Sequence, residues 1–196
     1  MRKSNSADNR QETVSEVEKG WLAGIIDGEG CLHIDLDPRG GAHPYLTVTN
    51  SNKLVIERVA DIWQRLGIGC RIQTRQNGRK NPVQDVQVIG YKRLKPALVA
   101  IMPYLIGKAD EALLLYRFVE SRLSRFNIHS PNGERGYNSE ELDIVQALKK
   151  QKLHNRISSE TNTLDYRMVE DRVRAARRLA EVARNEQPRL ISEQQN

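Results

Sequence analysis

Apolar and polar residues of this chain follow two spacings, the three-to-four-residue spacing of helices and the strict alternation of strands. The first helix is predicted over residues 16–28, because Ser15 and Glu18 have the spacing of a capping box and an apolar run follows them. Gly28 or Gly30 is expected to end this helix by accepting a positive φ. An alternating segment comes next, so the acidic residue between these glycines is predicted at a helix-to-strand junction.

The alternating segments predict four strands, at residues 32–37, 43–49, 70–76 and 83–89. In the third strand Ile72 is expected to be buried, with its polar neighbours on the opposite side. A helix between the second and third strands is predicted to be capped by Ser51 or Asn52 and to end at Gly67. A short helix has Pro96 in its first turn, and a longer helix follows it.

This order of elements predicts an α+β unit, with helices on one face of a four-stranded antiparallel sheet. The unit occurs once in the chain. A loop over residues 128–138, a helix from Ser139 to about Leu153 and a charged helix from about Leu164 to Arg184 follow it. We therefore expect three parts: a flexible N-terminal arm (1–14), a core (15–126) and a C-terminal helical extension (127–196).

Composition narrows the class of protein. The formal net charge of +6 favours a polyanionic partner. Cys31 and Cys70 lack the paired spacing of a zinc site, so we expect both to be reduced and one of them to be buried. Neither a membrane-spanning stretch nor the apolar core of a signal peptide is evident, which predicts an intracellular protein without a membrane partner.

The most informative segment is residues 22–30, which read LAGIIDGEG. Gly20, Gly24 and Gly28 share one helix face, where a second helix could approach closely, and Glu29 follows at the end of that face. Small residues and an apolar run are also typical of a tightly packed core helix. Nearly every position of the segment nevertheless resembles the nonapeptide signature of the LAGLIDADG homing endonucleases.

This resemblance implies the αββαββα homing-endonuclease fold with a DNA-binding sheet, here with extra C-terminal helices. Family members with one signature form homodimers in which the signature helices pack side by side. The same arrangement is expected here, on a pseudo-palindromic duplex. The implied dimer interface contains Gly20, Trp21, Gly24, Asp27 and Gly28.

The resemblance also implies a catalytic site. Glu29 and the Gly28 carbonyl are expected to bind Mg²⁺, with Mn²⁺ able to replace it and Ca²⁺ supporting binding without cleavage. Asn50 corresponds to a residue that orients the attacking water, although it could equally be a turn residue. Lys108 corresponds to a basic residue that stabilises transition-state charge, although a lone lysine is commonly a surface charge. A second basic position of the family is occupied by Leu54 here, and Lys53 is the candidate substitute for it.

Polar sides of the four strands form the candidate DNA surface. Any antiparallel sheet with one wet face shows such alternation, but the mixture of Arg, Gln and Asp suits major-groove readout. The DNA-binding candidates, including Arg39 in the turn after the first strand, are His33, Asp35, Asp37, Arg39, His43, Tyr45, Thr47, Arg71, Gln73, Arg75, Asp85 and Gln87. Thr49 lies on the same side, and Arg79 and Lys80 are expected to contact phosphates.

The function predicted from the sequence is therefore site-specific hydrolysis of double-stranded DNA, giving a staggered cut, by an intron-encoded homing endonuclease without a small-molecule substrate. The expected location is a bacterial or archaeal cytoplasm, or an organelle. Two alternatives use the same fold: an RNA maturase that assists intron splicing, and a non-catalytic DNA-binding regulator. Retention of Glu29 and Lys108 favours cleavage over the maturase, and residues 139–184 do not predict the helix-turn-helix that is typical of the regulators.

Overall fold

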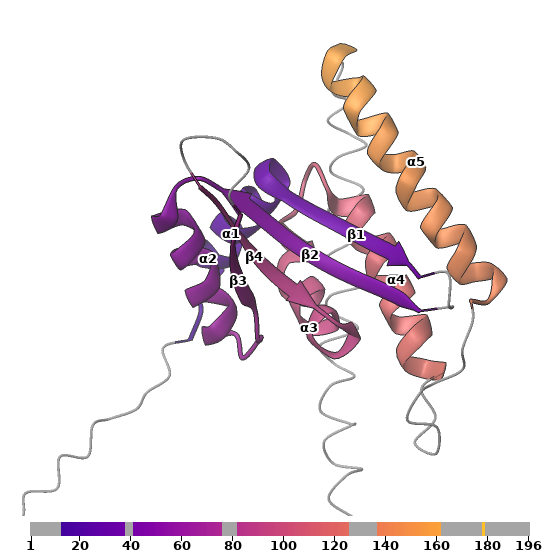
Figure 1. Cartoon of the computed structure of the whole chain (residues 1–196), viewed down its shortest axis with the longest axis horizontal. Helices are drawn as coiled ribbons and strands as arrows, with labels where there is room; N and C mark the ends of the chain where they lie inside the picture. Colours follow the sequence, from indigo (N-terminus) through magenta and orange to yellow (C-terminus); the bar gives the residue numbers. More distant parts are fainter. Residues whose placement is uncertain (1–12, 38–40, 76–81, 126–136, 162–177, 179–196) are drawn as a thin grey trace, which may run out of the picture.

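The computed structural model describes residues 13–37, 41–75, 82–125, 137–161 and 178 (Figure 1). The helices and strands follow one another as α1 (Glu16–Glu29), β1 (Gly30–Leu36), β2 (Ala42–Asn50), α2 (Lys53–Arg65), β3 (Arg71–Arg75), β4 (Val83–Ile89), α3 (Tyr91–Ile101), a 3₁₀ turn (Met102–Tyr104), α4 (Ala109–Arg125) and α5 (Ser139–Thr161). The charged helix predicted over residues 164–184 and most of the predicted 128–138 loop lie outside the described residues.

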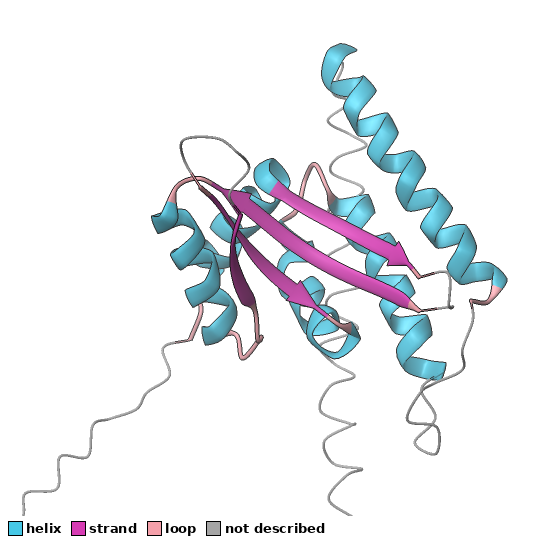
Figure 2. Cartoon of the chain, in the orientation of Figure 1, coloured by secondary structure: helices cyan, strands magenta, loops and turns pink. Residues whose placement is uncertain are grey.

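The four strands form one antiparallel sheet in the order β1-β2-β4-β3, with helices packed against one face (Figure 2). Leu32, Leu46 and Val86 point from the sheet into a buried core, where Trp63 of α2 and Phe118 of α4 are completely covered. The predicted α+β architecture is confirmed. Alternation along the strands produces it, because each strand offers one apolar side to the helices.

The start of α1 is held by local and long-range contacts. The Ser15 side chain accepts a hydrogen bond from the Glu18 backbone N–H, and the Glu18 carboxylate accepts one from the Ser15 backbone N–H, so the predicted capping box is confirmed. The same carboxylate accepts hydrogen bonds from Arg65 at 2.6 and 3.2 Å and from Arg58 at 2.5 Å. These contacts tie α1 to α2.

Hydrogen bonds from Arg65 lower the pKa of Glu18 from its ordinary value of 4.5 to about 2. A lowered folded-state pKa adds stability above the unfolded pKa, and that stability is lost as pH falls from 4.5 to about 2. We therefore expect the difference in thermal midpoint between the wild type and Glu18→Gln to be constant near neutral pH and to shrink across this window. A difference that does not change with pH would mean that Glu18 acts through packing instead.

Several helix ends differ from their predictions. Gly30 has φ −80°, not a positive φ. Pro96 lies inside α3 instead of in its first turn, since burial of Leu94 and Leu98 outweighs the backbone hydrogen bond that a proline cannot make. Asn138, and not Ser139, caps α5 by accepting from the Glu141 N–H at 2.7 Å, and the helix extends beyond its predicted end.

Two helix-end predictions hold: Asn52 caps α2 and Gly67 ends its final turn with φ +73°. Two predictions of burial were wrong, one for Ile72 and one for the cysteines. Ile72 is 47% exposed, because β3 is the edge strand of the sheet. Cys31 is exposed and Cys70 half-buried, so neither cysteine is buried.

Candidate nucleic-acid interface

The last residue of α1 is Glu29, and its side chain is exposed at the point where the chain turns into β1. The turn is tight: a Cβ at Gly30 would lie 2.5 Å from the Ile26 carbonyl oxygen, whose hydrogen bond from the Gly30 N–H closes the helix. Glycine is therefore required for close backbone approach and not for its φ. The consequence is a carboxylate fixed at a helix tip beside the first strand.

Asp27, two residues before Glu29, binds the loop that precedes α4. Its carboxylate accepts the Ile106 N–H at 2.8 Å and the Lys108 N–H at 2.8 Å, and the Lys108 ammonium donates to the Asp27 carbonyl. The Asp27 carboxylate is thus used within the protomer, and its place in the dimer interface stays a prediction. The contacts bring Lys108 to the same helix end as Glu29.

Asn50 is the last residue of β2. It lies at the same end of the strands as Glu29, because Gly30 pairs with Val48 in the antiparallel register. Its Oδ1 accepts the Asn52 N–H at 2.8 Å, which is the turn role considered from the sequence. The two N–H groups of its amide are the part of the side chain left for another partner. Lys53, the possible substitute for a family basic residue, is exposed and pairs with Glu57 at 3.3 Å.

No group of three or more His, Cys, Asp and Glu side chains is arranged for metal binding within the described part of the chain. A metal at this helix end would therefore need ligands in addition to the side chains of the described protomer. Gly28 and Glu29 lie in the last turn of α1, where the helix itself leaves carbonyl oxygens unused. A carboxylate and a carbonyl are hard oxygen donors, the type that Mg²⁺ prefers.

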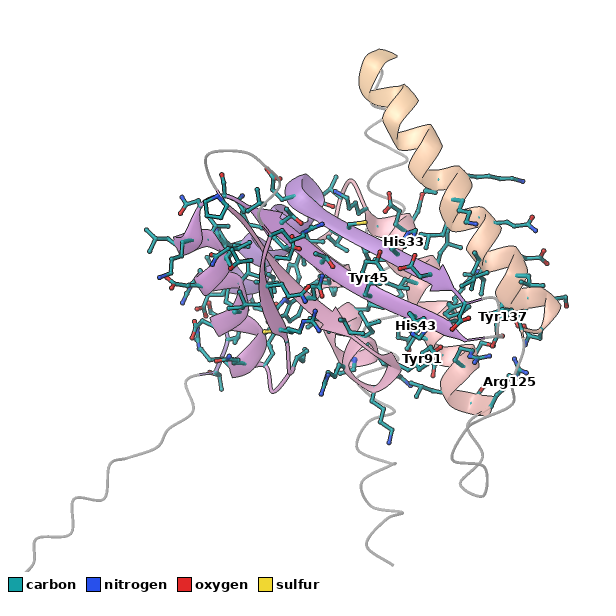
Figure 3. All side chains as sticks on the ribbon, in the orientation of Figure 1. His33, His43, Tyr45, Tyr91, Arg125 and Tyr137 are labelled. Atoms are coloured by element: carbon teal, nitrogen blue, oxygen red, sulfur yellow. The ribbon has the colours of Figure 1, made fainter. Side chains whose placement is uncertain are left out.

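The face of the sheet away from the helices carries the predicted polar side chains. Strand register pairs His33 with Tyr45 and Asp35 with His43, so all four lie on one face (Figure 3). His33 Nε2 is 2.8 Å from Asp35 Oδ1, and the His33 and Tyr45 ring centroids are 5.4 Å apart. Burial, with the nearby Asp35 charge, raises the pKa of Tyr45 to about 12, so its phenol stays protonated at neutral pH.

The other half of this face differs in part from the prediction. Register places Arg71 opposite Gln87 and Gln73 opposite Asp85 on the expected side. Asp85 is completely buried, however, and Thr47 is only 6% exposed, so neither can contact a base directly. Arg39, Arg79 and Lys80 lie outside the described residues.

Arg75 is held by Asp85 in a two-point ion pair, with Nε–Oδ2 at 2.5 Å and a second guanidinium nitrogen at 2.7 Å from Oδ1. Thr49 donates to the same carboxylate at 2.7 Å. Asp85 thus orients an arginine instead of reading a base, a role that the sequence pattern did not indicate. The alternation predicted correctly which face of the sheet Asp85 lies on. Only the pairing between strands shows that Arg75 binds its carboxylate.

An exposed strip runs along α1. Val17 is 83% exposed and Trp21 is 38% exposed, and a Cβ built on Gly20, Gly24 or Gly28 would meet no atom of the described protomer within 4 Å. Packing within the protomer therefore does not explain these three glycines. In the described residues, no helix is long and apolar enough to cross a membrane.

Comparisons with known proteins concern the domain and the fold. Residues 16–97 match the family model of the LAGLIDADG-like domain. The I-LtrWI LAGLIDADG homing endonuclease, solved bound to target DNA, is similar with a TM-score of 0.50 at 20% identity over 71% of this chain and 45% of that one. No curated protein matches the chain by sequence.

Two further solved structures are similar at lower TM-scores. The homing endonuclease I-CvuI, in complex with the I-CreI target and Mg, has 19% identity and a TM-score of 0.47 over 82% of this chain and 94% of that one. The group I intron-encoded homing endonuclease I-CeuI, complexed with DNA, has 16% identity and a TM-score of 0.47 over 70% and 78% of the two chains. Residues 16–97 therefore match the LAGLIDADG-like domain, and the chain shares its fold with the LAGLIDADG homing endonuclease I-LtrWI.

Proposed function

We propose that this protein is a homodimeric, Mg²⁺-dependent, site-specific endonuclease that makes a staggered cut in double-stranded DNA. The observation that carries the proposal is the clamp at the end of α1, where Asp27 brings Lys108 to the helix tip that ends in Glu29. We further propose that it is intron-encoded and acts in a bacterial or archaeal cytoplasm or in an organelle.

The exposed strip of α1 supports the homodimer. Val17 and Trp21 are exposed apolar residues, and the bare face around Gly24 allows another helix to approach closely. A two-fold contact along this strip would place a second α1 against the first, with the two helix tips side by side. Each dimer would then have two Glu29 carboxylates at one centre, which compensates for the single carboxylate per chain.

The residues present fit a hard divalent cation. Glu29 and the Gly28 carbonyl would hold it together with phosphate oxygens of the substrate, and Mn²⁺ would substitute while Ca²⁺ would support binding alone. Such an ion supplies an activated water and neutralises charge on the attacking and leaving oxygens. The chain itself provides the placement of these ligands at a rigid helix end.

Two further residues act on the scissile phosphate in this proposal. The Lys108 ammonium donates one hydrogen to the Asp27 carbonyl, so two remain for phosphate oxygens that gain charge in the transition state. The Asn50 amide can donate to a water molecule while its oxygen stays bound to the Asn52 N–H. A base-reading sheet adjoins them, with Arg75 oriented by Asp85 toward guanine acceptors.

The test is cleavage of the intron-free host locus by the full chain, with Mg²⁺ and with EDTA. Linear product that requires Mg²⁺ and carries staggered ends supports the proposal. Uncut DNA together with accelerated splicing of the intron RNA would identify a maturase. Tight DNA binding without either activity would identify a regulator, and both of these outcomes would overturn the nuclease.

Asp27→Asn is expected to slow cleavage roughly 10- to 100-fold at saturating DNA, with little change in DNA affinity. The amide keeps the shape of the side chain but offers one acceptor oxygen for the two N–H groups of Ile106 and Lys108, and small misplacements of reacting groups cost factors of this size. Single-turnover rates and binding titrations separate the two effects. Glu16→Gln, at the opposite end of α1, is the matched control, and equal rates for Asp27→Asn and the control would contradict a positioning role.

A further inference from the structure

A buried charged cluster joins α4, α5 and the sheet at the end of β1 and β2 that lies farthest from Glu29. Glu141, in the first turn of α5, is completely buried. Its carboxylate accepts hydrogen bonds from Arg125 at 2.9 Å, Ser121 at 3.2 Å and the Asn138 N–H at 3.2 Å, and Arg122 lies 3.4 Å away. The buried charge is therefore fully paired, as its desolvation requires.

Two tyrosines, Tyr91 and Tyr137, connect this cluster to the turn end of the β1–β2 hairpin. The Arg122 guanidinium lies 5.9 Å from the ring of Tyr91 and 5.8 Å from the ring of Tyr137. Tyr91 donates to the Ala42 carbonyl at 2.6 Å, and Tyr137 donates to the Gly41 carbonyl. Figure 3 shows both tyrosines, with Arg125, where α5 begins beside the ends of these strands.

The Gly41 carbonyl has a second partner, the Asp37 N–H at 2.7 Å, which closes the hairpin between β1 and β2. Tyr137 therefore bonds the closing residue itself. Burial raises the pKa of Tyr91 and of Tyr137, so both hydroxyls remain donors at neutral pH. An apolar contact would be enough to dock α5 on α4, but these directed bonds set where the hairpin backbone lies.

We infer that α5, through Glu141, Arg122, Tyr137 and Tyr91, positions the far end of the β1–β2 hairpin for reading the outer base pairs of the DNA half-site. The inference rests on the proposed function. It gives the C-terminal helix, which lies beyond the matched residues 16–97, a part in sequence specificity. Asp35 and His43, paired across the strands, are the side chains whose position it controls.

Strand geometry says which base pairs are concerned. From Gly30 to Leu36 the strand rises about 3.3 Å per residue, so the hairpin end lies about 20 Å from the tip of α1. At about 3.4 Å per base pair this is about six base pairs outward from the pair nearest Glu29. A substitution in the Glu141 cluster should therefore alter the base preference at these outer positions and leave the preference at the central positions unchanged.

The test compares the full-length wild type, Tyr137→Phe and Glu141→Gln by selection from a randomised duplex library in Ca²⁺ buffer. Tyr137→Phe removes only the hydrogen bond to the Gly41 carbonyl, so it keeps the test valid if Glu141→Gln fails to fold. Both variants are expected to lower base preference at the outer positions roughly 5-fold, within the range that one lost base contact costs. Glu140→Gln is the control, since Glu140 is an exposed acid in the same helical turn.

The outcomes are distinct. A loss of preference confined to outer positions supports the inference, and a merely structural role would lower the thermal midpoint without changing the selected sequence. Unchanged preference in Tyr137→Phe would overturn the inference alone. A wild-type chain that selects no sequence would overturn the proposed function and the inference with it.

Discussion

Glu29→Gln is expected to reduce double-strand cleavage by at least about 1,000-fold while DNA binding stays within a few-fold of the wild type. The substitution keeps the length of the side chain and removes the one charged oxygen donor at the tip of α1. Loss of a single group that stabilises developing charge costs about 100- to 1,000-fold in other enzymes, and here the change occurs twice in each dimer. Single-turnover cleavage and a filter or gel-shift titration measure the two quantities on one substrate.

Glu29 is exposed and makes no contact on which the core depends, so the variant should unfold at the wild-type temperature. Asp143→Asn is a matched control, because it removes one exposed carboxylate from α5 without approaching the helix tip. Residual cleavage within about 10-fold of the wild type would place the essential carboxylate elsewhere. Parallel loss of binding and cleavage would assign Glu29 to DNA contact instead of catalysis.

Gly24→Leu is expected to give a folded monomer that has lost at least 100-fold of its double-strand cleavage. A Cβ at Gly24 meets nothing within 4 Å in the protomer, so the larger side chain does not disturb its packing. In the proposed dimer the same side chain would lie between two closely packed helices and hold their two ends apart. Misplacing reacting groups by about 1 Å can lower an enzyme's rate by about 100-fold. Sedimentation in the presence of duplex, together with cleavage, measures both effects.

Gly24→Ala makes this experiment sharper. In a helix that faces only solvent, alanine is more favourable than glycine by about 1 kcal/mol, so the variant would be more stable and equally active. In a close helix pair even one methyl group is resisted, and dimerisation weakens. Gln64→Leu, an exposed position on α2, controls for the added apolar surface. A dimeric, fully active Gly24→Leu protein would exclude the proposed interface.

Local sequence signals predicted most of the fold. The capping box at Ser15 and Glu18, the alternation that ends at Ile89 and the left-handed glycine at Gly67 each depend on residues within one or two turns of one another. Such signals are complete in the sequence. Pro96 was misplaced because its helix is stabilised by burial against distant elements, which outweighs the local preference of proline.

The candidate site was only partly predictable. The signature singled out Glu29, and the family resemblance singled out Asn50, but the contacts of Asp27 join it to residues about eighty positions away. Nothing in the local pattern of either segment marks that pairing. The buried state of Asp85 was also missed, because alternation gives the face of a strand and not the side chain that covers it from the next one.

By itself, the sequence determined the helices, the strands, the side of each strand that faces the core and the exposed acidic end of α1, since these follow from periodicity and from nearest neighbours along the chain. Only the tertiary structure decided that Lys108 meets Asp27, that Asp85 orients Arg75, and that Tyr137, just before α5, bonds the β1–β2 hairpin. Each of these contacts joins segments brought together by burial of the shared core. Hydrophobic burial is non-directional, so the polar partners it brings into contact cannot be identified from either segment alone.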